Sequence, residues 1–371
     1  MIDPMLDAPD HPVRYQPGLE VEEDDEAGTS REMAETLHRI SATVQRDEGH
    51  AFRSVHAKSH GLLLGTLEVL GGLTPELAQG AFARPGRYPV VMRLSTTPGD
   101  LLDDQVSTPR AVALKIVGVE GERLPGTEGQ VTQDFLMVNG PVFSVSQAKK
   151  FLKNLKLLAP TTDKAPGLKK ALSIALRGIE AVIEKARGES ATLKALGGHP
   201  ATHILGETFF TQVPLLYGPY MAKLSLAPVS PELMALTDAP LDMTDRPNAL
   251  RDAVVEHFRH HGGVWELRAQ LCTNLDTMPI EDASVDWPQA ESPYIAVARV
   301  TVPPQLAWSD ARSIAVDDGM AFSPWHALAA HRPIGSIMRV RKASYEMAAR
   351  FRSEHNPTPV REPERLDALP D

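Results

Sequence analysis

Short apolar runs interrupted by glycine and proline fill the chain from about residue 50 onward, and they constrain its fold more than any other feature. Such runs, with turn residues between them, are typical of β-strands. Their spacing of roughly 8–20 residues predicts an antiparallel sheet that closes toward a barrel. We expect strand-forming segments at residues 51–57, 61–69, 88–95, 110–117, 134–138, 209–227, 264–272 and 294–302.

Other stretches follow the period of a helix. Between Ser30 and Asp47 an apolar residue recurs at every third or fourth position, with Ser30 available as a cap and Gly49 as a terminator. Further helices are expected within residues 146–193, near 248–261 and at 336–355, the last begun by a serine cap and stopped before Pro357. The pattern predicts an α+β fold, in which a barrel carries inserted helices and a C-terminal helix.

These patterns also suggest how the chain is divided. Residues 1–30 are rich in Pro, Asp and Glu and lack periodicity, so we expect an extended arm there. Residues 31–320 would form one helix plus the barrel domain, with the helical insertion at about 146–193. Residues 321–371 would form the C-terminal helix and a tail.

Composition excludes several classes of function. The net charge of −10 leaves no basic surplus for nucleic acid, and Cys272, the only cysteine, excludes intrachain disulfides and cysteine-held iron–sulfur clusters. The N-terminus lacks the basic and apolar regions of an export signal, and the apolar stretches are too short to span a bilayer. We therefore expect a cytoplasmic protein.

The expected C-terminal helix carries an unusual trio of side chains. Arg341, Tyr345 and Arg352 stand at positions i, i+4 and i+11, which share one helix face. Nearby positive charge favours a phenolate over a phenol, and a phenolate is a hard ligand for ferric iron. Taken alone, the pattern is more common on a surface helix, where arginine stacks on tyrosine.

Three earlier segments place polar side chains in apolar surroundings. Arg53 and His56 lie in the first expected strand, and Arg93 and Ser95 alternate onto one face of the third. An inward arginine needs an anion, and a neighbouring serine can orient an imidazole. Asn139 ends a further apolar strand at a Gly-Pro turn, where asparagine is a common turn residue. Each segment alone is more often structural than catalytic.

Together, the order and approximate spacing of these segments resemble those of the haem catalases. The resemblance covers about residues 50–155 and 205–352. The matching segments are Arg53-x-x-His56, Arg93-x-Ser95, Thr108-Pro109-Arg110-Ala-Val-Ala-Leu-Lys115, Asn139-x-Pro141-Val-Phe143 and Arg341-x-x-x-Tyr345.

The resemblance implies a distal, peroxide-binding side of a haem. His56 would move a proton between the two peroxide oxygens, Asn139 would hydrogen-bond the peroxide, and Ser95 would orient His56. Arg53 and His56 are three positions apart and would face opposite sides of an ideal strand, so we expect a bulge or strand start there.

The resemblance also implies the contacts of the haem itself, which would be haem b. Tyr345 would be the iron ligand and Arg341 its charge partner. Three arginines would hold the haem propionates, a phenylalanine would stack on the ring, and a valine would precede the distal histidine, as in catalases. These are Arg53, Arg93, Arg352, Phe151 and Val55.

The sequence departs from the catalase pattern at two places. Thr108 stands where a channel aspartate is expected, and Glu346-Met347-Ala348 replaces the usual Asp-Thr-His. The chain also has no room for the flavodoxin-like domain of large catalases. The similarity is therefore greatest to small catalase-related peroxidases, which use hydrogen or organic peroxides with a small reducing substrate. The acidic arm could wrap a second copy in a homo-oligomer, by analogy with larger catalases.

Other functions remain open. One is a haem enzyme that rearranges or cleaves fatty-acid hydroperoxides, although allene oxide synthases commonly have threonine where Val55 stands. A second is a haem-binding protein with little turnover. A third, without haem, is a metal hydrolase built on His257 and His261, whose i, i+4 spacing suits zinc but which lack a catalytic carboxylate at the right offset.

Overall fold

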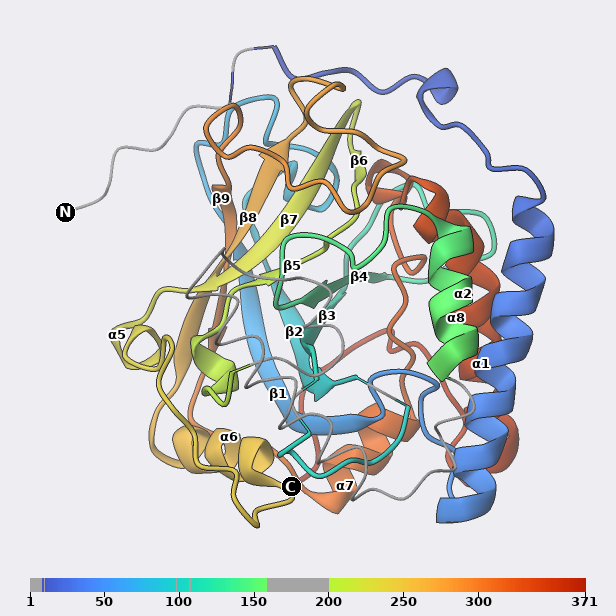
Figure 1. Cartoon of the computed structure of the whole chain (residues 1–371). Helices are drawn as coiled ribbons and strands as arrows, with labels where there is room; N and C mark the ends of the chain where they lie inside the picture. Colours follow the sequence, from blue (N-terminus) through green and yellow to red (C-terminus); the bar gives the residue numbers. More distant parts are fainter. Residues whose placement is uncertain (1–8, 10, 98, 107, 159–199) are drawn as a thin grey trace, which may run out of the picture.

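The fold is built around a closed ring of antiparallel strands (Figure 1). The computed structural model describes residue 9 and residues 11–97, 99–106, 108–158 and 200–371. The strands are β1 (Lys58–Val69), β2 (Gly86–Thr96), β3 (Arg110–Val117), β4 (Thr132–Val138), β5 (Phe209–Phe210), β6 (Leu215–Tyr217), β7 (Tyr220–Pro228), β8 (Gly263–Leu271) and β9 (Ile295–Val302).

The sheet order is β5-β4-β3-β2-β1-β9-β8-β7-β6, and β5 also pairs with β7. Because β5 bonds to both β4 and β7, eight strands form a closed barrel, and β6 continues the pairing beyond β7. Every pairing between neighbouring strands in this order is antiparallel. The predicted α+β fold with an antiparallel barrel is confirmed.

Alternation along the strands separates two buried faces. On β2, Val90, Met92 and Leu94 join the main core inside the barrel. Val91 points the other way, into a second apolar cluster formed with the segment 308–322 and the C-terminal tail. The outer face of β1–β4 is therefore buried as well, which explains why Arg93 is enclosed although it does not face the barrel core.

Three helices form a layer beside the barrel: α1 (Glu26–Glu48), α2 (Ala148–Leu158) and α8 (Ser336–His355). A fourth, α6 (Ala249–His260), packs on β1, where a Cβ on Gly61 would meet Val254 Cγ1 at 2.8 Å. The shorter helices are η1 (Pro17–Leu19), η2 (Gly80–Phe82), η5 (Ile204–Gly206), α5 (Pro231–Met234), α7 (Asp310–Ser313), η6 (Ile314–Asp318) and η7 (Ala329–His331).

The expected strand at 51–57 is wrong. This segment is a loop with bends, and β1 begins only at Lys58. His56 has a φ of 56°, in the left-handed region that few non-glycine residues adopt. The spacing of Arg53 and His56 is therefore set by a turn in the loop, without the strand bulge that an extended backbone would need.

The segment expected as one strand run at 209–227 is three strands. β6 and β7 form a tight hairpin in which Tyr217 pairs with Tyr220, and Gly218 has a φ of 61°. The insertion begins with a helix as expected, α2; its remainder, from residue 159 to 193, lies outside the described residues.

The expected C-terminal ends of α1 and α8 agree with the structure to within one residue, but two of the expected caps are wrong. α1 begins earlier than expected, with Asp25 accepting a hydrogen bond from Gly28 N, and Ser30 lies inside the helix. Gly49 does end it, with a φ of 70°. Ser336 does not cap α8 with its side chain.

Two carboxylates cap α8 instead. Glu281 accepts a hydrogen bond from Ser336 N at 2.7 Å, and Glu20 accepts one from Gly335 N at 3.1 Å. Arg339, one turn into the helix, donates to both carboxylates. Glu20 belongs to the N-terminal arm, so the arm helps to fix where α8 starts. The division of the chain into arm, barrel domain and C-terminal part stays a prediction.

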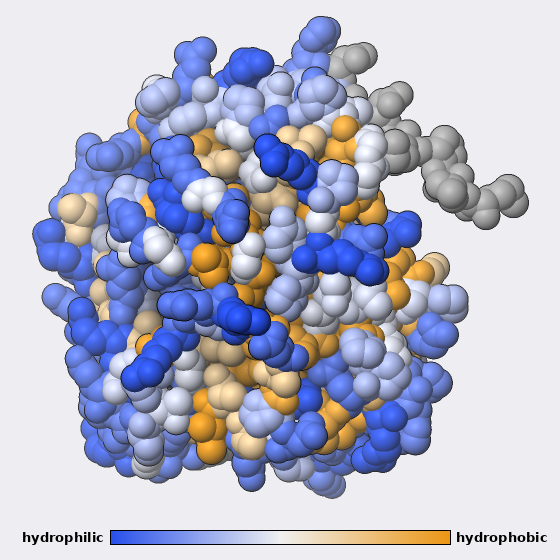
Figure 2. Space-filling view, turned by 180° about the vertical axis from the view of Figure 1, so that it is seen from behind, coloured by the Kyte–Doolittle hydropathy of each residue, from blue (hydrophilic) through white to orange (hydrophobic). Residues whose placement is uncertain are grey.

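The surface is that of an ordinary folded chain. Figure 2, which shows the face opposite to that of Figure 1, is largely hydrophilic at its edges, with hydrophobic residues scattered between polar ones. Within the described residues, no helix is both long and apolar enough to cross a membrane.

Candidate functional site

The loop that carries His56 is held by hydrogen bonds to its backbone. Arg93, on β2, donates from Nη2 to the carbonyl oxygens of His56 and Ala57, at 2.8 and 3.2 Å. Asn356, just after α8, bonds both the N–H and the carbonyl of Ala51. These contacts fix the turn that gives His56 its left-handed backbone.

His56 is held as a neutral imidazole. Burial lowers its pKa to about 3, and the positive charges of Arg93, Arg341 and Arg53 act in the same direction. Its Nδ1 is buried without a hydrogen-bond partner. The residue as a whole has intermediate exposure. A neutral imidazole with a free nitrogen can accept a proton at neutral pH.

Ser95 lies on β2 and Asn139 directly follows β4. Ser95 is buried on β2, but it does not hydrogen-bond His56 Nδ1, since that atom has no partner. Asn139 follows β4; its Oδ1 accepts a hydrogen bond from Arg110 N and its own N–H donates to Arg110 O, both at 2.9 Å. The side chain of Asn139 is thus fixed at the start of β3.

The three arginines expected at the propionates do come together. Arg53 and Arg352 both donate to the carbonyl oxygen of Met320, at 2.9 and 3.0 Å. Burial lowers the pKa of Arg352 to about 10, with the charge of Arg93 adding to the effect. Burial also lowers the pKa of Arg53, as do the charges of Arg93 and Arg352. The like charges therefore lie close enough to repel one another.

One anion is already supplied to this cluster by the chain. Asp317, on the π-helical turn η6, accepts hydrogen bonds on Oδ1 from Arg93 Nε at 2.6 Å and from Arg53 Nη1 at 3.1 Å. Sequence analysis missed Asp317. The only signal was the requirement that an inward arginine have an anion, which does not say where along the chain that anion lies.

On α8, Arg341 donates from Nη2 to Tyr345 Oη at 2.8 Å. The guanidinium carbon lies 5.3 Å from the centre of the Tyr345 ring and 5.9 Å from that of Phe143. The i, i+4 spacing thus makes the contact expected of it. Because the charge of Arg341 also affects the pKa of His56, the helix and the His56 loop face a common region.

Apolar side chains join these segments. Val55, Phe143 and Phe151 pack against one cluster that includes residues of α1, α2 and α8. The rings of Phe143 and Phe151 meet edge to face with centroids 5.0 Å apart. Phe143 lay within a matching segment, but sequence analysis gave it no role. Together these side chains form an apolar wall beside the Arg341–Tyr345 pair.

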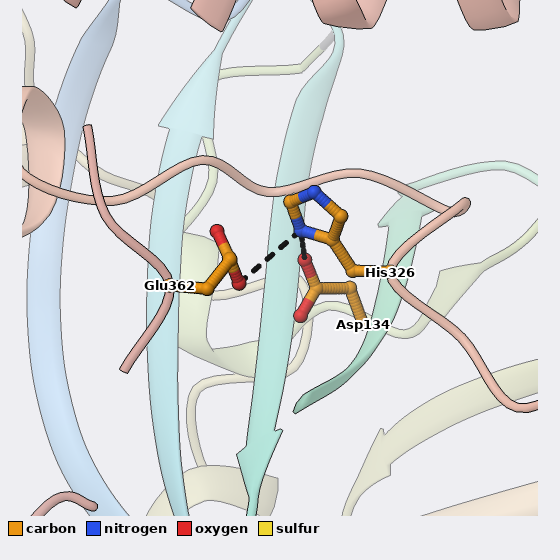
Figure 3. Close-up of side chains that lie close together, drawn as sticks. All are labelled: Asp134, His326 and Glu362. Carbon is orange, nitrogen blue, oxygen red and sulfur yellow. Dashed lines mark hydrogen bonds and ion pairs between the residues drawn. The ribbon is translucent and has the colours of Figure 1, made fainter. Parts of the chain in front are cut away.

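A second buried cluster was not expected from the sequence. Among the described residues, Asp134, His326 and Glu362 form a group whose ligand-type atoms lie within 4.8 Å of one another (Figure 3). His326 Nδ1 lies 3.2 Å from both Asp134 Oδ2 and Glu362 Oε2. Lys115, fully buried, bonds both carboxylates.

The formal charges in this group balance without a metal ion, although Glu362 Oε1 has no hydrogen-bond partner. The two carboxylates raise the pKa of His326 to about 9 despite its burial, so the imidazole is protonated at neutral pH. Hydrogen bonding to His326 and the charge of Lys115 lower the pKa of Glu362 to about 2. Two negative and two positive groups balance, and Lys115 takes the place that a cation would need. We call this set, Lys115, Asp134, His326 and Glu362, the ion quartet.

The pair proposed for a metal hydrolase does not form such a site. His257 Nε2 is hydrogen-bonded to the carbonyl oxygen of Gly262 at 3.0 Å, and its ring centroid lies 5.5 Å from that of His261. Neither histidine belongs to a group of three metal-ligand side chains among the described residues.

Solved structures with a similar fold are catalases. A fungal catalase (18% identity, TM-score 0.58) and catalase A from Saccharomyces cerevisiae (18%, 0.58) each match over 84% of this chain. A bacterial catalase matches over 89% at 15% identity, with a TM-score of 0.59.

The similarity establishes a catalase-like fold. The matches cover 61%, 63% and 64% of those three chains, so this chain spans less than two thirds of their length. No family model and no curated protein sequence matches the chain.

The ion quartet predicts a distinctive pH dependence of stability. Because the pKa of His326 is raised, its contribution is complete below its unfolded value near 6.5 and is lost as pH rises through 9. We expect the free energy of unfolding to fall by about 1–3 kcal/mol between pH 6.5 and 9, measured by urea denaturation.

Glu362→Gln should flatten this slope and lower stability at pH 6.5 by about 3–5 kcal/mol, because it leaves buried positive charge unpaired. Glu256→Gln, in an exposed pair with Arg259, is the control and should change stability by less than about 1 kcal/mol. A Glu362 variant as stable as the wild type, with the same pH slope, would show that the quartet does not hold the tail.

Proposed function

We propose that this protein is a haem b-dependent oxidoreductase that uses peroxide, of the small catalase-related peroxidase type. The observation that carries the proposal is the convergence of a buried arginine cluster, a neutral His56 and an Arg341–Tyr345 pair, contributed by widely separated segments on a catalase-like fold.

The residues present fit a haem. Two buried polar atoms, His56 Nδ1 and Arg352 Nε, have no partner in the chain. Arg53, Arg93 and Arg352 carry three positive charges, and the carboxylate of Asp317 bonds directly to Arg53 and Arg93. A ligand that brings carboxylates into this region would offset the surplus.

Each group has a part in the proposed chemistry. When bound, haem would supply the iron at which peroxide is reduced. Tyr345 would hold that iron through Oη, with Arg341 stabilising the anionic oxygen through its hydrogen bond. Phe143, Phe151 and Val55 would border the ring with apolar surface, and the three arginines would hold its carboxylates.

His56 is the proposed acid–base group. As a neutral imidazole it would take the proton from one peroxide oxygen and return it to the other. Asn139 would hydrogen-bond the peroxide from its fixed position after β4. Ser95 would reach His56 only after a local shift, because Nδ1 has no partner here. A small reducing substrate would supply the electrons for turnover.

Rearrangement of fatty-acid hydroperoxides is the second candidate, favoured by the absence of the channel aspartate at Thr108. Product analysis separates the two. Oxygen release from hydrogen peroxide or oxidation of a phenolic donor supports our proposal, whereas an allene oxide or cleaved aldehyde from a lipid hydroperoxide supports the alternative. A single cysteine, Cys272, suits a reducing compartment, and we place the activity in the cytoplasm.

Haem binding through Tyr345 is directly testable. Protein expressed with added haem should show a Soret band, and Tyr345→Phe should weaken haem affinity by at least about tenfold, since even outer partners of a metal ligand are worth ~10–100-fold. The measurement is a haem titration followed by the ferric absorption spectrum.

Tyr15→Phe is a matched control, because Tyr15 Oη also accepts from an arginine, Arg332, at 2.7 Å, but away from this region. It should leave the spectrum unchanged. An absence of any Soret band in the wild type would overturn the proposed function, and an unaltered spectrum in Tyr345→Phe would overturn the ligand assignment.

The role of His56 predicts both a variant and a pH profile. His56→Ala should retain haem and lose about 10²–10⁴-fold in the rate of peroxide reaction, measured by stopped flow. Since the pKa of His56 is about 3, the wild-type rate should be flat from about pH 5 to pH 8.

His257→Ala, on α6, serves as the control and should react at the wild-type rate. A wild-type rate that falls as pH drops through 6.5 would contradict a neutral, buried His56, and a fully active His56→Ala would exclude it as the acid–base group.

A further inference from the structure

Asp317 has more hydrogen bonds than a simple counter-ion needs. Its Oδ1 accepts from Arg93 and Arg53, and its Oδ2 accepts from Ser59 Oγ at 2.7 Å and Ser313 Oγ at 3.0 Å. Its own carbonyl oxygen also accepts from Arg53 Nη1, at 2.7 Å. Both oxygens of this buried carboxylate are therefore fully engaged, one by arginines and the other by hydroxyl groups.

The arginine side of Asp317 is the region that would receive a porphyrin carboxylate. Arg53 and Arg93 are two of the three guanidiniums in the cluster, and both converge on one oxygen atom of Asp317. The neighbouring carboxylate, Asp318, bonds His50 and Asn356 instead. Asp317 is thus the single carboxylate within the described residues that bonds these arginines directly.

The hydroxyl side of Asp317 anchors it independently of the arginines. Ser59 lies on β1, where its Oγ also accepts a hydrogen bond from Trp308 Nε1 at 3.0 Å, and Ser313 precedes η6 by one residue. If another carboxylate took over the arginines, Asp317 would keep both hydroxyl donors. Loss of the arginine contact would not leave this carboxylate without hydrogen-bond donors, which limits the free-energy cost of the exchange.

Asp317 also lies on a backbone type that suits small rearrangements. Residues 314–318 form a π-helical turn, with Gly319 as its last capping residue. Single π-turns are rare and occur mostly at functional sites. The side chain of Asp317 on this turn has two sets of hydrogen-bond partners, arginines at Oδ1 and serines at Oδ2. It can give up one set and keep the other.

We propose that Asp317 is an internal substitute for a haem propionate: it holds Arg53 and Arg93 in place in the haem-free chain and gives up part of that contact when a porphyrin carboxylate arrives. The inference rests on the proposed function. It makes Asp317 a positioning residue that preserves the binding geometry before haem is bound and competes with the haem afterwards.

Competition gives a clear direction for Asp317→Asn, which keeps the shape and removes the charge. We expect this variant to bind haem about tenfold more tightly than the wild type, within the usual 5–150-fold range of coupling between ligands. Its affinity for haem dimethyl ester, which has no free carboxylate, should not change. Glu256→Gln, which removes an exposed carboxylate paired with Arg259 on α6, is the control and should leave haem affinity within about twofold.

A second measurement uses no haem. Asp317→Ala removes the substitute and leaves the arginines without it, so the haem-free variant should melt at a lower temperature than the wild type. Acetate should raise its melting temperature by about 2 °C or more over chloride at equal ionic strength, and should not do so for the wild type.

The outcomes separate this inference from the proposed function. If acetate rescues Asp317→Ala but the wild type binds no haem, the carboxylate exchange holds and haem is the wrong ligand. If the wild type binds haem but Asp317→Asn binds it equally or more weakly, Asp317 supports the site without competing for it, and the inference is overturned. Failure of acetate rescue also counts against it.

Discussion

The rest of the site depends on the hydrogen bonds that the guanidinium of Arg93 donates. This guanidinium joins β2 to the His56 loop through two carbonyl oxygens and to η6 through Asp317. A buried arginine is costly unless it is paired and hydrogen-bonded, so its partners are constrained to come to it. One side chain therefore holds the backbone of His56 and bonds the one carboxylate that, among the described residues, contacts the cluster directly.

Two charged clusters lie on this outer face, and they differ in their balance of charge. In the ion quartet two positive groups meet two carboxylates, so the formal charges of the four side chains balance. The arginine cluster has three positive groups, and two of them, Arg53 and Arg93, bond the carboxylate of Asp317. The ring of Phe322 lies between the two, 5.4 Å from Lys115 Nζ and 5.7 Å from the guanidinium carbon of Arg53. The balanced cluster holds the tail in place, and the unbalanced one is available for an anionic ligand.

The regular elements could be predicted because their patterns are local. The expected bounds of β3 and α8 agree with the structure, since alternation and helical period are written in adjacent residues. The loop at 51–57 has the same apolar texture as a strand, but it is held by contacts with Arg93 and Asn356, far along the chain. No local pattern contains that information. The caps of α8 were missed for the same reason, because Glu20 and Glu281 reach it from distant segments.

The site could be predicted in part through the resemblance to haem catalases. Arg53, Arg93 and Arg352 do converge, and Arg341 does bond Tyr345, as their spacing implied. The hydrogen bond from Ser95 to His56 could not be tested from spacing, because it depends on the direction of an imidazole in a left-handed turn. The role of Asp317 could not be predicted from the sequence, because an aspartate two positions before a glycine is usual in a loop. Only the π-helical turn brings this residue to β2.

Arg341 links the two halves of the proposed chemistry. Its charge helps to keep His56 neutral, and the same guanidinium donates to the oxygen of Tyr345. A positive charge disfavours the protonated, cationic form of a nearby imidazole. The proposed reaction needs an unprotonated imidazole on one side of the haem and an anionic oxygen on the other. A single arginine, four residues before the tyrosine on one helix, acts on His56 through its charge and on Tyr345 through its hydrogen bond.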